Sequence, residues 1–358
     1  MIKILKTIPI TYYLLIGLPV AILGSWLHWN PMLNFIAACV GLIPLAGLIG
    51  EGTEVLAVFT GPKIGGLLNA TLGNAAELII TIVAIRAGLL DLVKASITGS
   101  ILGNVLLVLG ASLLLGGLKN GRQRFNREHA ATNATMLVLA VVALCIPSLL
   151  NHTLEGEALP GPITEAMSLG VAGVMIILYL LGLLYSLRVS DSALTGGGAA
   201  SEAPHWSART ASLVLGGATI GVVWLSEVLV HSVEAVIATS GLSEFFLGII
   251  LIPIIGNVAE HIVAVQVALK DHMDLSVEIA LGSSLQIALF VAPVLVFISL
   301  LFGEQLNLVF NQFELIALIA AVLTAALVSS DGETNWLEGA ELLAVYLILG
   351  LAFFFLPA

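Results

Sequence analysis

Two glutamates, Glu77 and Glu260, interrupt apolar stretches of a strongly hydrophobic chain. Each follows a Gly-Asn pair and precedes another apolar run, so we expect each carboxyl group at membrane depth rather than in a loop. A carboxylate at that depth costs on the order of 3 kcal/mol unless it is paired, protonated or hydrated. Carboxylate oxygens are hard ligands that suit calcium. The pair therefore predicts a cation site that also takes protons, the alternative being two protonated glutamates that only hydrogen-bond between helices.

An asparagine lies three residues before each of these glutamates, at Asn74 and Asn257. This spacing places amide and carboxyl groups on the same helical face. The amide oxygens are expected to act as further cation ligands or to orient the carboxylates. Asparagine also joins membrane helices by hydrogen bonds, and the sequence leaves both roles open.

Polar residues of the next apolar segments share helical faces in the same way. Ser100 and Asn104 are four residues apart, and Ser283 and Gln286 are three apart. We expect the two serines to contact the cation, and Asn104 and Gln286 to line its access path. For the first pair, close helix packing through small residues is an equally good interpretation.

Four more acidic residues lie on two other apolar segments, Glu51 and Glu54 on one and Glu227 and Glu234 on the other. Acidic residues within membrane helices mark ion and proton paths, so we expect all four to line an access path. Solvated helix ends explain Glu51 and Glu234 equally well.

His261 follows Glu260 directly. Because histidine titrates near neutral pH, it is expected to modulate proton coupling, although a neutral histidine packed between helices is the alternative. The Glu-His pair also raises the question of an intramembrane metalloprotease. No second histidine follows at the spacing of a His-Glu-x-x-His site, so no enzyme is predicted.

Glycines beside the two glutamates predict irregular helices. Gly73 and Gly256, the second with Pro253 just before it, are expected to loosen or break their helices. Discontinuous helices of this kind free backbone carbonyls to face a transported cation.

The composition of the chain fits lipid rather than water as its main solvent. The 358 residues are 59% hydrophobic and 10% charged, values outside the range of soluble domains. Cys39 and Cys145 lie within apolar runs and are expected to be inert buried thiols. A membrane-spanning helix takes about 20 apolar residues, and the apolar runs predict eleven spans, at 8–26, 33–59, 64–88, 92–117, 129–150, 164–187, 210–234, 242–269, 276–302, 310–329 and 335–356.

The distribution of basic residues predicts how the chain is oriented. The first span is expected to be retained, since no small-residue cleavage site of a signal peptide follows it. With the N-terminus inside, ten of the 12 lysines and arginines fall on the inner side and only Arg86 and Lys94 lie outside, as the positive-inside rule requires. Eleven spans then put the C-terminus outside. The inner residues are Lys3, Lys6, Lys63, Lys119, Arg122, Arg124, Arg127, Arg188, Arg209 and Lys270.

The two halves of the chain match each other at a constant offset of 183 residues. Residues 73–77 (Gly-Asn-Ala-Ala-Glu) correspond to 256–260 (Gly-Asn-Val-Ala-Glu), and Glu51 corresponds to Glu234. The matching spans are five apart, so the halves have opposite orientations, and inverted repeats of this kind place a transport site near mid-membrane. The predicted fold is an all-α integral membrane protein of about 11 transmembrane helices, with an N-terminal helix in 1–30, a five-helix repeat in 31–188, a cytoplasmic linker in 189–209 and a second, inverted five-helix repeat in 210–358.

These motifs resemble the cation/proton exchanger family of the calcium/cation antiporter superfamily. Each Gly-Asn-x-x-Glu motif is followed one span later by Gly-Ser, at 99–100 and 282–283. Residues 123–126, before the fifth span, and 331–339, entering the last, are similar to the same family. Eukaryotic relatives carry a strongly acidic segment between the halves, whereas residues 189–206 hold only Asp191 and Glu202. This difference argues against a calcium-sensing acidic helix.

The resemblance implies a secondary antiporter that exchanges calcium for protons. In the family the two motif glutamates bind calcium alternately with protons, which carries over to Glu77 and Glu260. Calcium is then the transported substrate, and no cofactor is expected. The alternative is a sodium-coupled or broad-specificity cation exchanger. A passive channel would share the acidic pore without proton-dependent uphill transport.

The expected partners are calcium ions, protons and the lipid bilayer, with no role for nucleic acid, and the chain could form a homo-oligomer. Short loops and the lack of a targeting extension fit a multi-pass protein of a prokaryotic cytoplasmic membrane. The N-terminus is predicted to be cytoplasmic and the C-terminus to lie on the opposite side.

Overall fold

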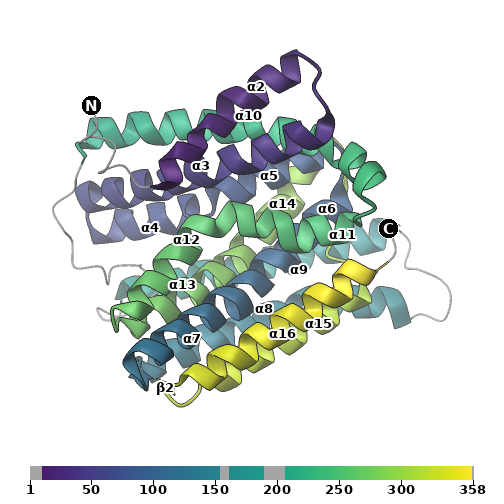
Figure 1. Ribbon diagram of the computed structural model, residues 1–358. Helices are drawn as coiled ribbons and strands as arrows, with labels where there is room; N and C mark the ends of the chain where they lie inside the picture. The colour runs from purple at the N-terminus through teal and green to yellow at the C-terminus, as the bar shows by residue number, and fades with distance from the viewer. Residues whose placement is uncertain (1–9, 154–160, 189–205, 357–358) are drawn as a thin grey trace.

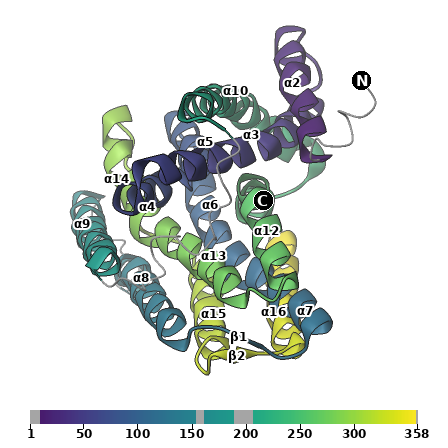
Figure 2. The same ribbon diagram turned by 90° about the vertical axis from the view of Figure 1, so that its left-hand side faces the viewer.

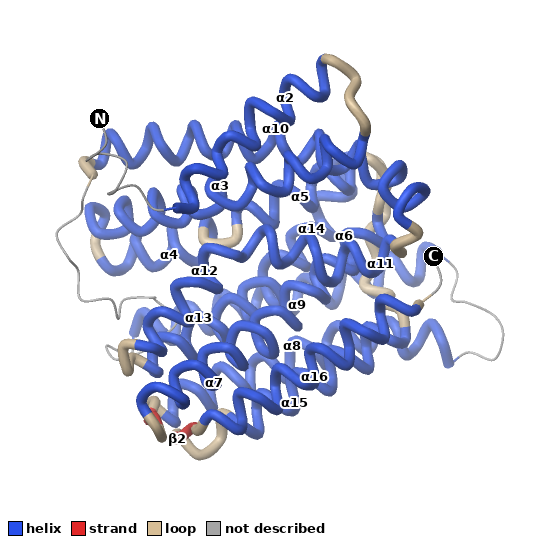
Figure 3. Tube along the Cα trace, viewed as in Figure 1, coloured by secondary structure: helices blue, strands red, loops and turns tan. Residues whose placement is uncertain are grey.

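The computed structural model describes residues 10–153, 161–188 and 206–356, which form a bundle of long helices (Figures 1 and 3). One two-stranded sheet accompanies the helices in these residues. The all-α membrane class predicted from the sequence is confirmed. Lys3, Lys6 and most of the predicted linker, including Asp191 and Glu202, lie outside the described residues.

The first half of the chain places its helices one after another with short connections. In chain order they are η1 (Ile10–Ile16, a 3-10 helix), α2 (Gly17–Trp26), α3 (Pro31–Thr60), α4 (Pro62–Leu72), α5 (Ala75–Arg86), α6 (Leu90–Leu102), η2 (Gly103–Val108, a π-helix), α7 (Leu109–Asn120), strand β1 (Gln123–Arg124), α8 (Arg127–Thr153) and α9 (Gly161–Arg188).

The second half follows a similar course. Its elements are α10 (Ala208–Ser240), α11 (Glu244–Phe246), η4 (Leu247–Leu251, a π-helix), α12 (Ile252–Leu269), α13 (Met273–Gln286), η5 (Ile287–Val291, a π-helix), α14 (Ala292–Ser299), η6 (Leu300–Phe302, a 3-10 helix), α15 (Gln312–Val328), strand β2 (Glu333–Thr334) and α16 (Trp336–Phe355).

Among the described residues, eight helices are long and apolar enough to cross a membrane. A ninth crossing results if Ile64–Leu72 and Ala75–Arg86, which are bent by 41° relative to each other, form one broken span. Two shorter apolar helices, Tyr12–Trp26 and Gln312–Val328, complete the set. Each predicted span thus coincides with helical structure, and the chain is a multi-pass membrane protein. The number of crossings stays a prediction, because length and composition alone define these spans.

Helices α2, α3 and α10 pack together along one side of the bundle (Figures 1 and 2). Small residues bring them close: Gly17 of α2 lies against the backbone of Gly41 in α3, and Gly221 of α10 faces Leu45 of α3. Close approach of this kind is the usual source of helix association in lipid. This layer packs on α5 and α12, the helices that carry the two motif glutamates.

Helices α5, α6, α12 and α13 lie near the middle of the bundle, with α8 and α9 to one side and α7, α15 and α16 to another (Figure 2). Two of the four central helices come from each half of the chain. The motifs of both halves therefore meet at the centre of the molecule.

Strands β1 and β2 connect the two halves at one end of the bundle. They pair antiparallel, with Gln123 opposite Thr334 and Arg124 opposite Glu333, and the Arg124 guanidinium lies 2.9 Å from the Glu333 carboxylate. These strands belong to the stretches at 123–126 and 331–339 that carry part of the family resemblance. Their shared role is therefore to hold two distant connections together.

Details of the backbone recur at the 183-residue offset. Left-handed conformations follow the ends of α5 and α12, at Gly88 (φ 79°) and Asp271 (φ 66°). The π-helical segments η2 and η5 also begin and end at nearly corresponding positions. A π-helical turn takes more residues than an α-helical turn and is frequent at functional sites. The correspondence thus extends from residue types to local backbone geometry.

The predicted helix break occurs in one half only. The chain bends at Gly73 and Asn74, between α4 and α5, whereas α12 is continuous from Ile252 to Leu269. Gly256 was expected to loosen or break its helix, and the break is absent there. Pro253 lies two residues after the end of the π-helical segment η4, and local π geometry of this kind satisfies the backbone groups that a proline leaves free in membrane helices.

Candidate cation-binding site

Glu77 lies in the first turn of α5, directly after the bend at Gly73 and Asn74. A helix N-terminus carries a partial positive charge that favours an acidic side chain. The side chain is buried, with 6% of its surface exposed. Its carboxylate rests on Gly256 of α12, where a Cβ atom would lie 2.9 Å from Oε1. Gly256 therefore allows the close approach of the first carboxylate to the second helix.

Glu260 lies one turn beyond Gly256 on the same helix. Its carboxylate accepts a hydrogen bond of 2.7 Å from the Ser283 hydroxyl of α13, and the side chain is partly exposed. The charges of Glu77 and Glu260 interact with each other. The structure thus brings together the two glutamates that the sequence singled out.

The motif asparagines connect the two halves of the chain. Asn74, directly before α5, donates to the Gln286 side chain of α13 at 2.5 Å. Asn257 of α12 donates to the Ser100 hydroxyl of α6 at 3.4 Å and to the Pro253 carbonyl at 3.0 Å. Gln286 thus contacts a motif asparagine, and its expected place on the access path stays a prediction.

The amide oxygens of Asn74 and Asn257 are buried without a hydrogen-bond partner in the described part of the chain. Buried polar atoms are nearly always paired, so an exception calls for an explanation. The described residues hold no group of three or more His, Cys, Asp or Glu side chains arranged to bind a metal ion. A cation here would therefore take two carboxylates together with amide and hydroxyl oxygens, which is the hard ligand set of calcium.

Helix α6 reaches the site because Gly99 has no side chain. A Cβ atom at Gly99 would overlap the backbone of Ile249 in η4. Gly282, its counterpart at the 183-residue offset, faces open space. The small-residue packing and the polar contact of Ser100 are therefore both real features of α6, since the first brings the second into place.

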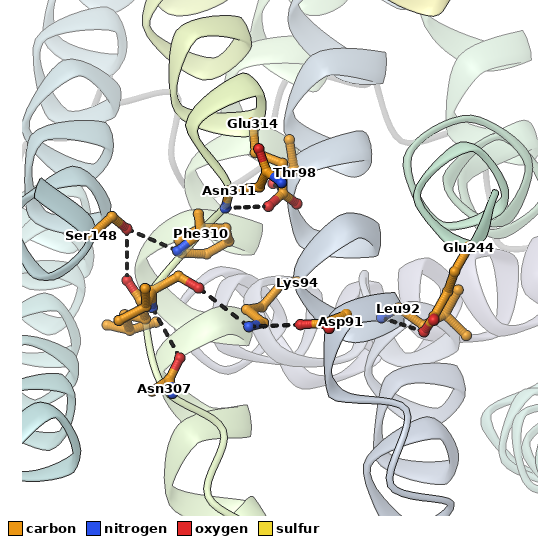
Figure 4. A network of polar contacts seen from close by, with 12 residues as sticks. Asp91, Leu92, Lys94, Thr98, Ser148, Glu244, Asn307, Phe310, Asn311 and Glu314 are labelled. Carbon is orange, nitrogen blue, oxygen red and sulfur yellow. Dashed lines mark hydrogen bonds and ion pairs between the residues drawn. The ribbon is translucent and has the colours of Figure 1, made fainter. Parts of the chain in front are cut away.

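A polar network holds α6 at its N-terminal end (Figure 4). The Lys94 ammonium lies 2.9 Å from Asp91 and donates to the Val309 carbonyl at 3.2 Å. Deeper in the bundle, Thr98 donates at 3.2 Å to the buried Glu314 carboxylate, which also caps α15. These contacts link α6 to the connection that precedes α15. They fix the helix that presents Ser100.

Two other predicted residues each have a buried nitrogen without a hydrogen-bond partner in the part of the chain that the structure describes. Asn104 is buried in η2 and its amide nitrogen has no partner in the described residues. The ring Nε2 of His261 is likewise buried and without a partner there. Access and proton coupling by these two side chains stay predictions.

The four other acidic residues divide between two regions. Glu54 is exposed, and its charge interacts with that of Glu260, while the nearby Glu51 accepts a hydrogen bond of 2.6 Å from Tyr12. Glu227 and Glu234 both line a cavity of about 450 Å³. Access through these four residues stays a prediction.

Sequence reasoning missed an ion pair between the Arg86 guanidinium and Glu227, 2.6 Å apart. It also missed the Gly256 contact with Glu77. Each depends on two helices that are distant in sequence. The position of Arg86, as one of two basic residues predicted outside, was the only signal that could have drawn attention to it.

Comparisons with known proteins agree with this geometry. The sodium/calcium exchanger protein family matches residues 31–188 and 210–355. The chain is 45% identical to a Ca(2+)/H(+) antiporter of Aphanothece halophytica, covering 97% of both chains. It is also 45% identical to the Ca(2+)/H(+) antiporter ChaA of Bacillus subtilis, covering 95% of this chain and 97% of that protein.

Solved structures show the same architecture. The structure of YfkE superposes with a TM-score of 0.85 at 42% identity, covering 97% of this chain and 100% of that one. The H+/Ca2+ exchanger CAX shares the fold, with a TM-score of 0.74 at 15% identity over 96% of this chain and 91% of its own. The resemblance to cation/proton exchangers is confirmed. On the motifs, the central site and these matches, the chain belongs to the sodium/calcium exchanger protein family.

Proposed function

We propose that this chain is a secondary antiporter that exchanges calcium for protons by alternating access, and that both ions compete for Glu77 and Glu260. The observation that carries the proposal is the meeting of these two carboxylates at the contact between α5 and α12, beside two unpartnered amide oxygens. The names of the full-length relatives support calcium and protons as the exchanged ions.

Competition at one site explains how the two fluxes are coupled. Two ionised carboxylates without a cation are costly at membrane depth. Calcium offsets their charge, and in its absence protons do so. A conformational change with the doubly charged, empty site is therefore disfavoured. The conformational change therefore takes place with calcium bound in one direction and with protons bound in the other.

The proposal extends to the layout of the chain. Residues 31–188 and 210–358 act as two inverted five-helix repeats that contribute one glutamate each, joined by a cytoplasmic linker at 189–209. The bacterial relatives favour a cytoplasmic membrane as the location. The N-terminus then faces the cytoplasm and the C-terminus the opposite side.

The decisive experiment is calcium uptake into proteoliposomes that contain the purified protein, under an imposed pH gradient. We expect uphill calcium movement that stops when the proton gradient is collapsed. Uptake that persists under a sodium gradient alone would favour the sodium-coupled or broad-specificity alternative. Movement only down the calcium gradient, whatever the pH, would indicate a channel.

A further inference from the structure

An ion pair joins the helix that carries Glu77 to the layer formed by α3 and α10. Arg86 ends α5, and its guanidinium lies 2.6 Å from the Glu227 carboxylate in α10. Arg86 is 57% and Glu227 29% exposed at the side chain, so neither partner is fully buried. His231, one turn further along α10, lies 4.0 Å from the same carboxylate.

The pair lies in a cavity of about 450 Å³ between α5 and α10, which Val83 and Glu234 also line. Val83 is the lining residue of α5 nearest in sequence to Glu77. Six residues of helix separate the two, which is about 9 Å along the axis. Because Glu77 is buried and is not among the lining residues, the cavity ends before it reaches the glutamates.

The surroundings of Glu260 differ. Glu260 is partly exposed, and the charge of the exposed Glu54 of α3 acts on its carboxyl group. At the 183-residue offset, Arg86 corresponds to Leu269 and Glu227 to Pro44, so no equivalent ion pair forms on the side that faces Glu54. The charged contact is therefore present on one of two otherwise related sides.

We propose that the Arg86–Glu227 ion pair is a latch that holds α5 against α10, and so favours the conformation in which the glutamates are reached from the Glu54 side. The inference rests on the proposed alternating access, because a latch matters only if the cavity beside Val83 opens in another conformation. Because no equivalent ion pair forms on the related side, the two conformations differ in free energy. The resting protein is thus biased toward one side of the membrane.

The test is the accessibility of two single cysteines in purified protein whose native Cys39 and Cys145 are replaced by alanine. Val83→Cys reports opening of the cavity, and Gly50→Cys, where a Cβ meets nothing within 4 Å, reports the Glu54 side. The measurement is the rate of labelling by a hydrophilic maleimide. Arg86→Gln should raise labelling at position 83 about two- to fivefold, the range for a water-exposed ion pair, without raising it at position 50.

Two further variants make the result specific. The charge swap Arg86→Glu with Glu227→Arg should return labelling at position 83 toward the parent rate. Arg124→Gln breaks a different exposed ion pair, with Glu333, and should leave it unchanged. Arg86 is the better residue to replace, because in a Glu227 variant Arg86 could pair with Glu234 in the same cavity.

Unchanged labelling at position 83 in Arg86→Gln would overturn the latch, as would an equal rise in Arg124→Gln or at position 50. Failure of the charge swap to restore the rate would do the same. Labelling requires no transport, so the two proposals fail separately. Loss of proton-driven calcium uptake in the parent protein contradicts the proposed function, whereas working exchange with unchanged labelling contradicts only the latch.

Discussion

The two glutamates of the site are held in different ways. Glu77 is buried at the start of α5, against the backbone of Gly256. Glu260 is partly exposed and accepts a hydrogen bond from Ser283. Because the surroundings differ, we expect the two carboxyl groups to contribute unequally to the proposed ion binding, even though they occupy related positions in the sequence.

Replacing either glutamate with glutamine should abolish calcium exchange. Glutamine keeps the shape of the side chain but can neither titrate nor neutralise a divalent cation. The measurement is proton-driven calcium uptake in proteoliposomes, with thermal unfolding to verify that the variants fold. Glu128→Gln, at an exposed position at the start of α8, is the matched control and should transport normally. Parent rates in Glu77→Gln or Glu260→Gln would refute the site.

Calcium affinity should fall on acidification. Protons and calcium compete for the same two carboxylates, so if binding displaces about two protons, affinity weakens up to roughly a hundredfold per pH unit where the calcium-free site is fully protonated. At higher pH, where the calcium-free site is already ionised, the dependence should flatten. Calcium binding between about pH 5.5 and 8.5 measures this effect in purified protein.

The Glu77→Gln, Glu260→Gln double variant is the control for the pH dependence, since it has no carboxylate at the site to titrate. A parent affinity that stays constant across the pH range would contradict competition even if transport were confirmed.

Part of the site could be predicted from residue types alone. The two Gly-Asn-x-x-Glu motifs, at 73–77 and 256–260, identified the residues that meet at the centre. The hydrogen-bond partner of Asn74 could not be predicted, because the two matching asparagines form different contacts. Asn74 bonds to Gln286, whereas Asn257 bonds to Ser100. Side-chain pairing across helices depends on their relative rotation, which the sequence match does not determine.

At the scale of the helices, the two halves use their shared motif differently. The first half bends between α4 and α5, and in the second half α12 is continuous and follows a π-helical segment. A glycine in a sequence motif is compatible with a bend and with close packing alike. The sequence therefore allowed either a bend or close packing at Gly73 and at Gly256. The neighbouring helices determined which of the two formed.

The matched glycines Gly99 and Gly282 allow a test of how α6 is positioned. Gly99→Ala should destabilise the protein by roughly 1–3 kcal/mol, because the new methyl group overlaps the backbone of Ile249 and the core is already filled. It should also weaken calcium binding, since it displaces Ser100. Gly282→Ala adds its methyl group to open space and should be neutral or slightly stabilising.

Thermal unfolding in detergent and calcium titration of both variants measure these effects. Equal stability of the two variants would mean that α6 does not depend on the contact at Gly99.

At the scale of the whole molecule, composition and charge were sufficient to predict a multi-pass helical protein. The predicted spans coincide with helical structure because apolar length alone determines whether a helix is stable in lipid. The arrangement of those helices was not predictable. In particular, the pairing of β1 with β2 brings residues 123–124 to 333–334, and no local pattern in the sequence indicates that contact.

The predicted orientation can be tested with two cysteines at opposite ends of the molecule, in a protein without native cysteines. Arg122 precedes β1, and Gln305 precedes α15, and both are exposed. The distribution of basic residues predicts Arg122 on the cytoplasmic side and Gln305 on the other. In intact bacterial cells a membrane-impermeant maleimide should label Gln305→Cys, and label Arg122→Cys only after permeabilisation. Labelling of both without permeabilisation would overturn the predicted orientation.

The π-helical segments at 103–108 and 287–291 also bear on the history of the chain. A π-helical turn accommodates more residues than the α-helical turn it replaces, so an inserted residue is its simplest origin. If the two halves descend from one duplicated gene segment, a single insertion before the duplication explains both segments, whereas a later origin requires two independent events at corresponding positions. An ancestral half would then already have contained the π-helical turn. Deleting one residue there would rotate everything beyond it by about 100°, and so would turn the helix away from the partners it now contacts.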